Sequence, residues 1–327
     1  MDAAFQRGTG QAPFILASCV TNLMGGTWRF GLIVGVTGTT EQHYGGLAAT
    51  EVLIRAQIDA INKKFNTPNV FNGTLEFYVD QVYSFSTGVA AEYAKPHPKH
   101  AYRMVYDGFP AAGGGWFGSY QAIYHSWAVG LNGGTFGSDA TDGLTHEFAH
   151  ARGAIDLYAM AVDAVNNPIN GWDYKVTTSS IMNNPYGVSD WDTHTVNIIN
   201  TNKKTWAPTI DYITKAFPPG FEVLVTDAAG KPQAGVDVAL YPVEWHKRTL
   251  SAAAAVTGRT DATGRFVLPS NPFGPGQPGN AWDIRYCNFL VEAKRGTAVS
   301  YRWLPIDGVQ NFYFTNSKAK FVIGLTL

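Results

Sequence analysis

The stretch "GLTHEFAHARGAIDLY", residues 143–158, holds two histidines four residues apart, with a glutamate beside the first and a glycine and an aspartate after the second. On a helix, positions i and i+4 share one face, so His146 and His150 would present their imidazoles one turn apart. This spacing suits two ligands of one zinc ion, which takes imidazole nitrogen at about 2.0–2.1 Å. The pattern predicts a helix at about Asp142–Arg152 that carries a metal site.

Gly153 and Asp156 extend the pattern beyond the helix. If the helix continued, Asp156 would lie about 15 Å along the axis from His146, too far to share an ion. We therefore expect the chain to turn back at Gly153, since glycine takes the positive φ that ends helices at little steric cost. The turn makes Asp156 a third zinc ligand. The alternative is that Asp156 caps a helix in "LYAMAVDAVNN" that follows it.

Glu147 points about 100° around the helix from His146, toward a metal-bound water rather than the metal. There it can take a proton from water whose pKa zinc has lowered and deliver it to a leaving amine, as a general base. The full set of residues from His146 to Asp156 arises by chance in on the order of one such chain in tens of thousands. We therefore prefer a zinc site to a coincidence.

Residues 146–156, "HEFAHARGAID", resemble the signature of the metzincin metallopeptidases, with aspartate as third ligand as in the snapalysin-type peptidases. The family has a later methionine turn, and "TTSSIMNNPYG" (177–187) looks like it, which implies that Met182 packs beneath the metal. Several members carry a tyrosine two residues after that methionine, where this chain has Asn184. Tyr186 is the nearest tyrosine. It would stabilise the tetrahedral oxyanion or coordinate the metal in the resting enzyme, or it would only pack against neighbouring residues. The resemblance covers about residues 27–204.

An aspartate in place of the family's commoner third histidine lowers the charge of the zinc site from +2 to +1, which should weaken the lowering of the water pKa. We expect an activity optimum at neutral to mildly alkaline pH. A pH–rate profile with its basic limb below about pH 5 would count against this expectation.

The chain has 327 residues and predicts two domains. We expect an N-terminal extension at 1–26, an α+β, zincin-like catalytic domain at 27–210 with a twisted mixed sheet, and an all-β accessory domain at 221–327. Periodicity predicts strands at 27–38, 73–85 and 101–109, helices at 45–66 and from an N-cap at Ser189 onward, and a glycine-rich loop at 110–120.

The C-terminal part alternates short strands with glycine-containing turns, as in "TGRTDATGRFVLP". It resembles the transthyretin-like or carboxypeptidase-regulatory-like sandwiches, with an Ig-like or prealbumin-like fold, that are appended to secreted enzymes. Such a domain would bind a protein or glycan, or only stabilise the enzyme.

Composition excludes some classes of partner. With 45% hydrophobic and 15% charged residues and a net charge of -1, the chain gives no reason to expect nucleic acid, and no segment approaches a membrane span of about 18 apolar residues. We expect a monomer that is secreted or cell-surface, with its leader absent from this chain. Two cysteines, Cys19 and Cys287, allow at most one disulfide; free thiols are preferred.

Other candidate sites have simpler interpretations. His97 and His100 in "KPHPKH" are expected to be solvated surface residues. Calcium binding by Asp139 and Asp142 is possible but unsupported, since caps at the start of a helix explain them as well. Aromatic residues of "GGGWFGSY" (113–120) would line a peptide or sugar subsite or cover the core.

These residues together predict a zinc-dependent endopeptidase that acts on a protein or peptide, with a glycoprotein as one possible substrate. The first alternative is a protein- or glycan-binding module with a non-catalytic zinc site, and the second is an enzyme that hydrolyses a non-peptide amide. The intact Glu147 argues against the first alternative, since a structural site needs no base. The sequence leaves the cleavage preference open.

Overall fold

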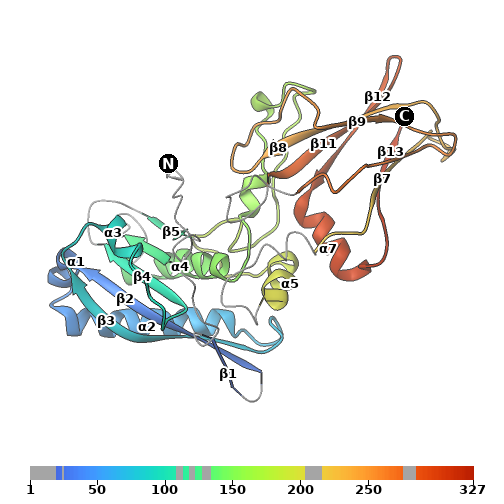
Figure 1. Ribbon diagram of the computed structural model, residues 1–327. Coiled ribbons are helices and arrows are strands. Elements are labelled where there is room, and N and C mark those ends of the chain that lie inside the picture. Colours follow the sequence, from blue (N-terminus) through green and yellow to red (C-terminus); the bar gives the residue numbers. More distant parts are fainter. Residues whose placement is uncertain are drawn as a thin grey trace. The chain divides into compact units, whose positions relative to one another are not determined.

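A computed structural model describes residues 20–23, 26–107, 113–117, 122–126, 134–202, 216–274 and 285–327 (Figure 1). The chain divides into two compact units. The first takes Met1–Ile155 and Ser179–Thr209, and the second takes Asp156–Thr178 and Ile210–Leu327. In the described part of the chain, no helix is long and apolar enough to cross a membrane.

The first unit is mixed α+β. Its strands are β1 (Val20–Leu23), β2 (Thr27–Thr37), β3 (Thr74–Phe85), β4 (Tyr102–Asp107), β5 (Gly113–Phe117) and β6 (Ala122–Ser126). Its helices are α1 (Gly38–His43), α2 (Leu47–Phe65), α3 (Val89–Tyr93), the 3₁₀ helix η3 (Gly134–Phe136), α4 (Ser138–Ala151) and α5 (Thr193–Asn202).

All six strands form one mixed sheet. β2 pairs in parallel with β3 and with β4, β4 pairs in parallel with β6, and β1 is antiparallel to β2. β5 lies at the end of the strand order and pairs antiparallel with β6. The parallel strands are joined by helical crossovers such as α2, which is the strand–helix–strand order that periodicity predicts.

Helices α2 and α4 pack on the same face of this sheet (Figure 1). The Phe77 ring of β3 lies 5.2 Å from the ring of Phe65 in α2 and 4.5 Å from the ring of Phe148 in α4. All three side chains are at most 1% exposed, so they form the centre of the core. Burial of each such ring stabilises the fold by about 1.5–3 kcal/mol. This core anchors the helix that carries the histidine motif.

Two local predictions were wrong. Residues 113–117 form strand β5 rather than part of a loop; the rest of the predicted loop, apart from those strand residues, lies outside the described residues. Helix α5 begins at Thr193 rather than after Ser189 because the Asp192 carboxylate accepts hydrogen bonds from the Thr195 amide and hydroxyl, at 2.9 and 2.6 Å. Ser189 instead donates to Asp142 in α4 at 3.1 Å.

A buried ionic cluster joins α3 to β4. The Glu92 carboxylate accepts hydrogen bonds from Arg103 at 3.0 Å, from Lys95 at 2.5 Å, from Thr87 at 3.0 Å and from the Tyr83 hydroxyl. Burial alone would raise the pKa of Glu92, but the hydrogen bonds from Lys95, Tyr83 and Thr87 and the Lys95 charge outweigh it and lower that pKa. Glu92 is therefore a buried anion held by hydrogen bonds.

The second unit consists mainly of strands. They are β7 (Phe221–Thr226), β8 (Asp237–Glu244), β9 (Val256–Arg259), β10 (Arg265–Val267), β11 (Tyr286–Arg295), β12 (Ala298–Pro305) and β13 (Phe321–Thr326). One sheet has the order β10-β7-β13 and the other β12-β11-β8-β9. The Phe273 ring lies 6.4 Å from Phe221 of the first sheet and 5.2 Å from Phe289 of the second, so one core serves both sheets.

The second unit is not all-β as expected, because helix α7 (Ile306–Asn316) follows β12 directly. Ile306 and Val309 of this helix are fully buried, and the Phe312 ring meets Phe321 of β13 at 5.0 Å. Aromatic residues in "NFYFTN" favour strands by propensity, and burial of one helix face outweighs that preference.

Residues 156–178 group with the second unit, although the sequence pattern places them in the catalytic domain. They contain the 3₁₀ helices η4 (Leu157–Met160) and η5 (Ala164–Asn166). Cys287 Sγ contacts the Ala159 carbonyl oxygen at 3.2 Å, and the Asn288 side-chain amide donates to the Met160 carbonyl at 3.1 Å. These bonds join the segment to β11 of the second unit. Periodicity in the sequence does not predict them.

Candidate metal centre

Helix α4 begins at Ser138, earlier than predicted, and ends at Ala151 with a glycine turn. The Gly153 amide donates to the His150 carbonyl at 2.8 Å, and the Ala154 amide donates to the Ala149 carbonyl at 2.9 Å. This is the pattern of a Schellman motif, and Gly153 takes the φ of +96° that the motif requires. The chain turns back at Gly153, as the position of Asp156 demands.

The two histidine rings meet at their Nε2 atoms, which lie 2.9 Å apart. His146 Nδ1 lies 2.9 Å from the Ile181 carbonyl oxygen, and His150 Nδ1 lies 2.8 Å from the Ala154 carbonyl oxygen. A carbonyl oxygen only accepts, so both Nδ1 atoms carry the ring hydrogen and both Nε2 lone pairs face each other. Two such lone pairs repel unless a cation, either a proton or a metal ion, is shared between them.

This arrangement has the form that metal-binding histidines take in proteins. A ligating imidazole almost always donates its other N–H to a carbonyl or carboxylate, which fixes the ring and raises its basicity. Two nitrogens bound to one tetrahedral zinc ion lie about 3.3 Å apart. The observed 2.9 Å needs only a small opening of the pair to reach that separation. The rings are thus oriented as two ligands would be.

Asp156 supplies the carboxylate. One ligand atom from each of His146, His150 and Asp156 can be chosen so that all three lie within 4.8 Å of one another, and all three residues are buried. Asp156 precedes η4, but its side chain makes no capping hydrogen bond, which contradicts the capping alternative. Two imidazoles and a carboxylate are a donor set that zinc accepts, so the group fits a metal ion.

Glu147 occupies a different position from the ligands. From Ala140 to Ala151 every residue of α4 is buried except Gly143 and Glu147, which lie one turn apart on the same face. A Cβ atom at Gly114 of β5 would lie 3.4 Å from Glu147 Cγ and 3.6 Å from its Oε1. The carboxylate therefore lies against the backbone of the edge strand on the accessible face of the helix.

Tyr186 lies over the same face of α4. Its ring carbon Cε1 is 3.1 Å from where a Cβ of Gly143 would stand, and 40% of its surface is exposed. Burial raises the pKa of the Tyr186 hydroxyl, and the negative charge of Glu147 raises it further. A raised pKa keeps the hydroxyl protonated, so it remains a hydrogen-bond donor beside Glu147.

Met182 is fully buried within a turn of the chain. The backbone amides of Asn183 and Asn184 both donate to the Ser180 carbonyl oxygen. The Met182 backbone amide donates to the Ser180 side-chain oxygen Oγ at 3.0 Å. Ser180 Oγ in turn donates to Asp192 at 2.6 Å. This network fixes the turn, and with it the Ile181 carbonyl that orients His146.

The structure gives different outcomes for the remaining candidates. His97 is buried at 2% exposure, so its expected place on the solvated surface was wrong; its Nδ1 lies 3.1 Å from the His100 carbonyl. Asp142 pairs with Lys64 at 2.5 Å and Asp139 lies in the first turn of α4, so calcium binding by these two residues stays an unsupported prediction. Cys287 is a buried free thiol.

Two further predictions depend on residues or side chains that the structure does not describe. Cys19 and Tyr120 lie outside the described residues, and the side chains of Trp116 and Phe117 are not described either. The aromatic subsite expected in "GGGWFGSY" therefore stays a prediction.

The sequence pattern does not predict two groups that contact the candidate ligands. The Ile181 carbonyl acts through its backbone, which no residue type reveals. His246 Nε2 lies 3.0 Å from Asp156 Oδ2, although the two residues are far apart in the chain. Spacing rules find ligands on one helix, whereas this contact depends on the tertiary fold.

A comparison with models of known protein families finds no match, and neither does a comparison with curated proteins. The case for a function therefore depends on the geometry and chemistry of these residues.

Proposed function

We propose that this chain is a secreted zinc-dependent endopeptidase of the metzincin-like class. The observation that carries the proposal is the pair of Nε2 atoms 2.9 Å apart, each on a ring whose Nδ1 donates to a backbone carbonyl. His146, His150 and Asp156 would hold the metal. A zinc ion bound there lowers the pKa of its water and polarises the scissile carbonyl.

The chain's own residues take the remaining roles. Glu147 accepts the proton of the attacking water and transfers it to the leaving amine, so that the water oxygen forms the new carboxyl group. Tyr186 donates a hydrogen bond to the developing oxyanion, and its raised pKa keeps it able to do so at mildly alkaline pH. Met182 packs beneath the ligands as a polarizable core residue.

Strand β5 supports an extended peptide as the substrate. It ends the strand order, so among the described strands it pairs with β6 alone. Its glycines leave the backbone open for close approach, and Gly114 lies against Glu147. A peptide that added a strand to this edge would gain main-chain hydrogen bonds beside the general base.

The proposed fold classes follow from the same elements. A mixed sheet with an antiparallel edge strand, covered by α2 and a motif-bearing α4, supports a zincin-like first unit. Two sheets that share the core around Phe273 support an Ig-like or prealbumin-like sandwich in the second unit, with α7 as an addition.

The test is cleavage of an unfolded protein by the wild type and by Glu147→Gln. General acid–base catalysis contributes about 10²–10⁴-fold, so the variant should lose that factor in kcat/KM while it keeps its zinc. Asp139→Asn, a matched amide substitution in the first turn of α4, should leave the rate unchanged.

The outcomes separate the candidate functions. Zinc binding with no hydrolysis in the wild type would favour the binding module. Hydrolysis of small amides without proteolysis would favour an amide hydrolase. Proteolysis that survives Glu147→Gln would show that another residue is the base and overturn the proposed mechanism.

A further inference from the structure

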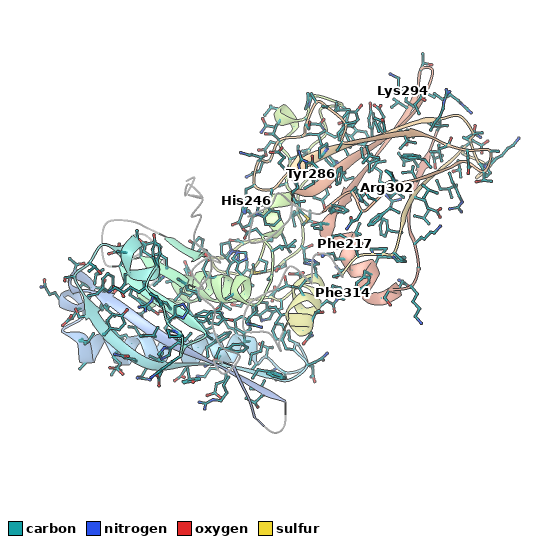
Figure 2. The ribbon with its side chains drawn as sticks, in the orientation of Figure 1. Phe217, His246, Tyr286, Lys294, Arg302 and Phe314 are labelled. Atoms are coloured by element: carbon teal, nitrogen blue, oxygen red, sulfur yellow. The ribbon has the colours of Figure 1, made fainter. Side chains whose placement is uncertain are left out.

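The Asp156 carboxylate is held by His246, and both residues belong to the second unit. His246 Nε2 lies 3.0 Å from Asp156 Oδ2, and the two side chains are 38% and 10% exposed. An ionised carboxylate only accepts hydrogen bonds, so the His246 Nε2 atom carries the hydrogen and donates it. His246 extends from the turn that follows β8 (Figure 2).

The turn around His246 makes contacts along the segment that begins with Asp156. Beyond the His246 contact, Arg248 Nη2 donates to Asp163 Oδ1 at 3.0 Å, and the Leu250 amide donates to the Asn166 carbonyl at 3.0 Å. Successive residues of the turn thus bind successive parts of the segment. Of these three contacts, only that of His246 reaches the Asp156 side chain.

The backbone of this turn is strained. His246 has a φ of +59° and Arg248 a φ of +52°, a left-handed conformation that residues other than glycine seldom take. Such conformations cost free energy, and they persist where the surrounding contacts determine them. The Trp245 ring meets the His246 ring edge-on at 5.0 Å and the Tyr158 ring meets it at 5.8 Å, so the imidazole is oriented on two sides.

We propose that His246 is a positioning residue for the metal centre: it holds Asp156 Oδ2 so that the second, buried oxygen Oδ1 is presented to a divalent cation. This inference rests on the metal centre of the proposed function. Carboxylates that bind metals are themselves hydrogen-bonded, and loss of such a partner typically lowers metal affinity about 10–100-fold. His246 would therefore contribute to metal affinity through its hydrogen bond to Asp156.

The test is the zinc dissociation constant, measured by competition with a chromophoric chelator, for the wild type and three variants of His246. Glutamine carries its Nε2 four bonds from Cα, as histidine does, whereas asparagine tolerates the left-handed backbone but is one bond shorter. We expect His246→Ala and His246→Asn to weaken zinc binding about 10–100-fold, and His246→Gln to recover most of the loss.

Arg248→Ala is the matched control, because it removes an exposed ion pair from the same turn without touching Asp156. It should bind zinc like the wild type. Cobalt substitution adds a readout of the ligand field: the visible absorption bands should shift in His246→Ala and return in His246→Gln. Near-UV circular dichroism of the metal-free proteins checks that each variant is folded.

Unchanged zinc affinity in His246→Ala would overturn the inference and leave the peptidase proposal intact. Equal weakening in all four variants, Arg248→Ala included, would also overturn it, since the turn would then act as a whole. Zinc binding that depends on His246 without any proteolysis would overturn only the peptidase proposal. A wild type that binds no zinc would overturn both.

Discussion

Metal removal should lower the thermal stability of the protein by a predictable amount. The perturbation is replacement of zinc by a chelator, which leaves two Nε2 lone pairs 2.9 Å apart with no metal ion between them. An ion that binds only the folded state, at a free concentration about 1,000 times its Kd, stabilises that state by about 4 kcal/mol. For folded units of about 150–250 residues, each kcal/mol shifts Tm by about 2–4 °C, so we expect a shift of about 8–16 °C.

The assay is differential scanning calorimetry of zinc-loaded and chelated protein, with the zinc content per chain measured by elemental analysis. His146→Ala and His150→Ala should bind less than one zinc and lose the shift. Asp156→Ala should keep only part of it, because two imidazoles remain. His43→Ala, an exposed histidine outside the motif, should keep the whole shift.

Two results would refute this reasoning. One is an identical Tm with zinc and with chelator in the wild type, which would mean that the histidine pair does not hold the metal. The other is a full zinc-dependent shift in His146→Ala, which would place the ion elsewhere in the chain.

Three further predictions concern stability, measured by urea denaturation. Phe148→Ala removes a fully buried ring and should lower the free energy of unfolding by about 3–5 kcal/mol, whereas Val52→Ala, at a position 66% exposed, should cost about 0.5 kcal/mol or less. Gly153→Ala forces alanine to a φ of +96° and should cost about 1–2 kcal/mol; an unchanged midpoint would show that the turn relaxes. Glu92→Gln leaves buried Arg103 without that carboxylate and should cost about 3–5 kcal/mol at pH 7, against about 1 kcal/mol or less for Glu76→Gln in a half-exposed pair with Arg29. The folded-state pKa of Glu92 is lowered from its ordinary 4.5, so the stabilisation by its charge is present above pH 4.5 and is lost as the pH falls through the folded-state pKa. If the wild type were still more stable than Glu92→Gln below that pKa, Glu92 would not act as a buried anion.

Periodicity in the sequence was informative for the elements that depend on local pattern. The strand expected at 27–38 is β2 at Thr27–Thr37, and the helix expected at 45–66 is α2 at Leu47–Phe65. In both, apolar residues recur at regular spacing along a single segment. This spacing predicts the element without knowledge of the strand or helix against which it packs. The positive φ of Gly153 was predictable for the same reason, since a helix must end before Asp156 can approach His146.

Patterns with two local solutions were less informative. Glycines 113–115 predicted a loop, but pairing of β5 with β6 makes a strand of them. Ser189 and Asp192 are both good N-cap residues, and the choice depends on Ser189 being bound to Asp142 in another helix. His97 looked solvated in a polar stretch, yet the fold buries it.

The sequence by itself determined which residues are candidates for metal binding and catalysis, because the i, i+4 histidines, the adjacent glutamate and the glycine turn lie in one continuous segment whose geometry follows from helix pitch. Only the tertiary structure decided how those residues are held. The Ile181 carbonyl orients His146, Gly114 and Tyr186 lie beside Glu147, and His246 holds Asp156. The physical reason is that a hydrogen bond or close contact between distant segments depends on the packing of whole elements, which local spacing along the chain does not encode.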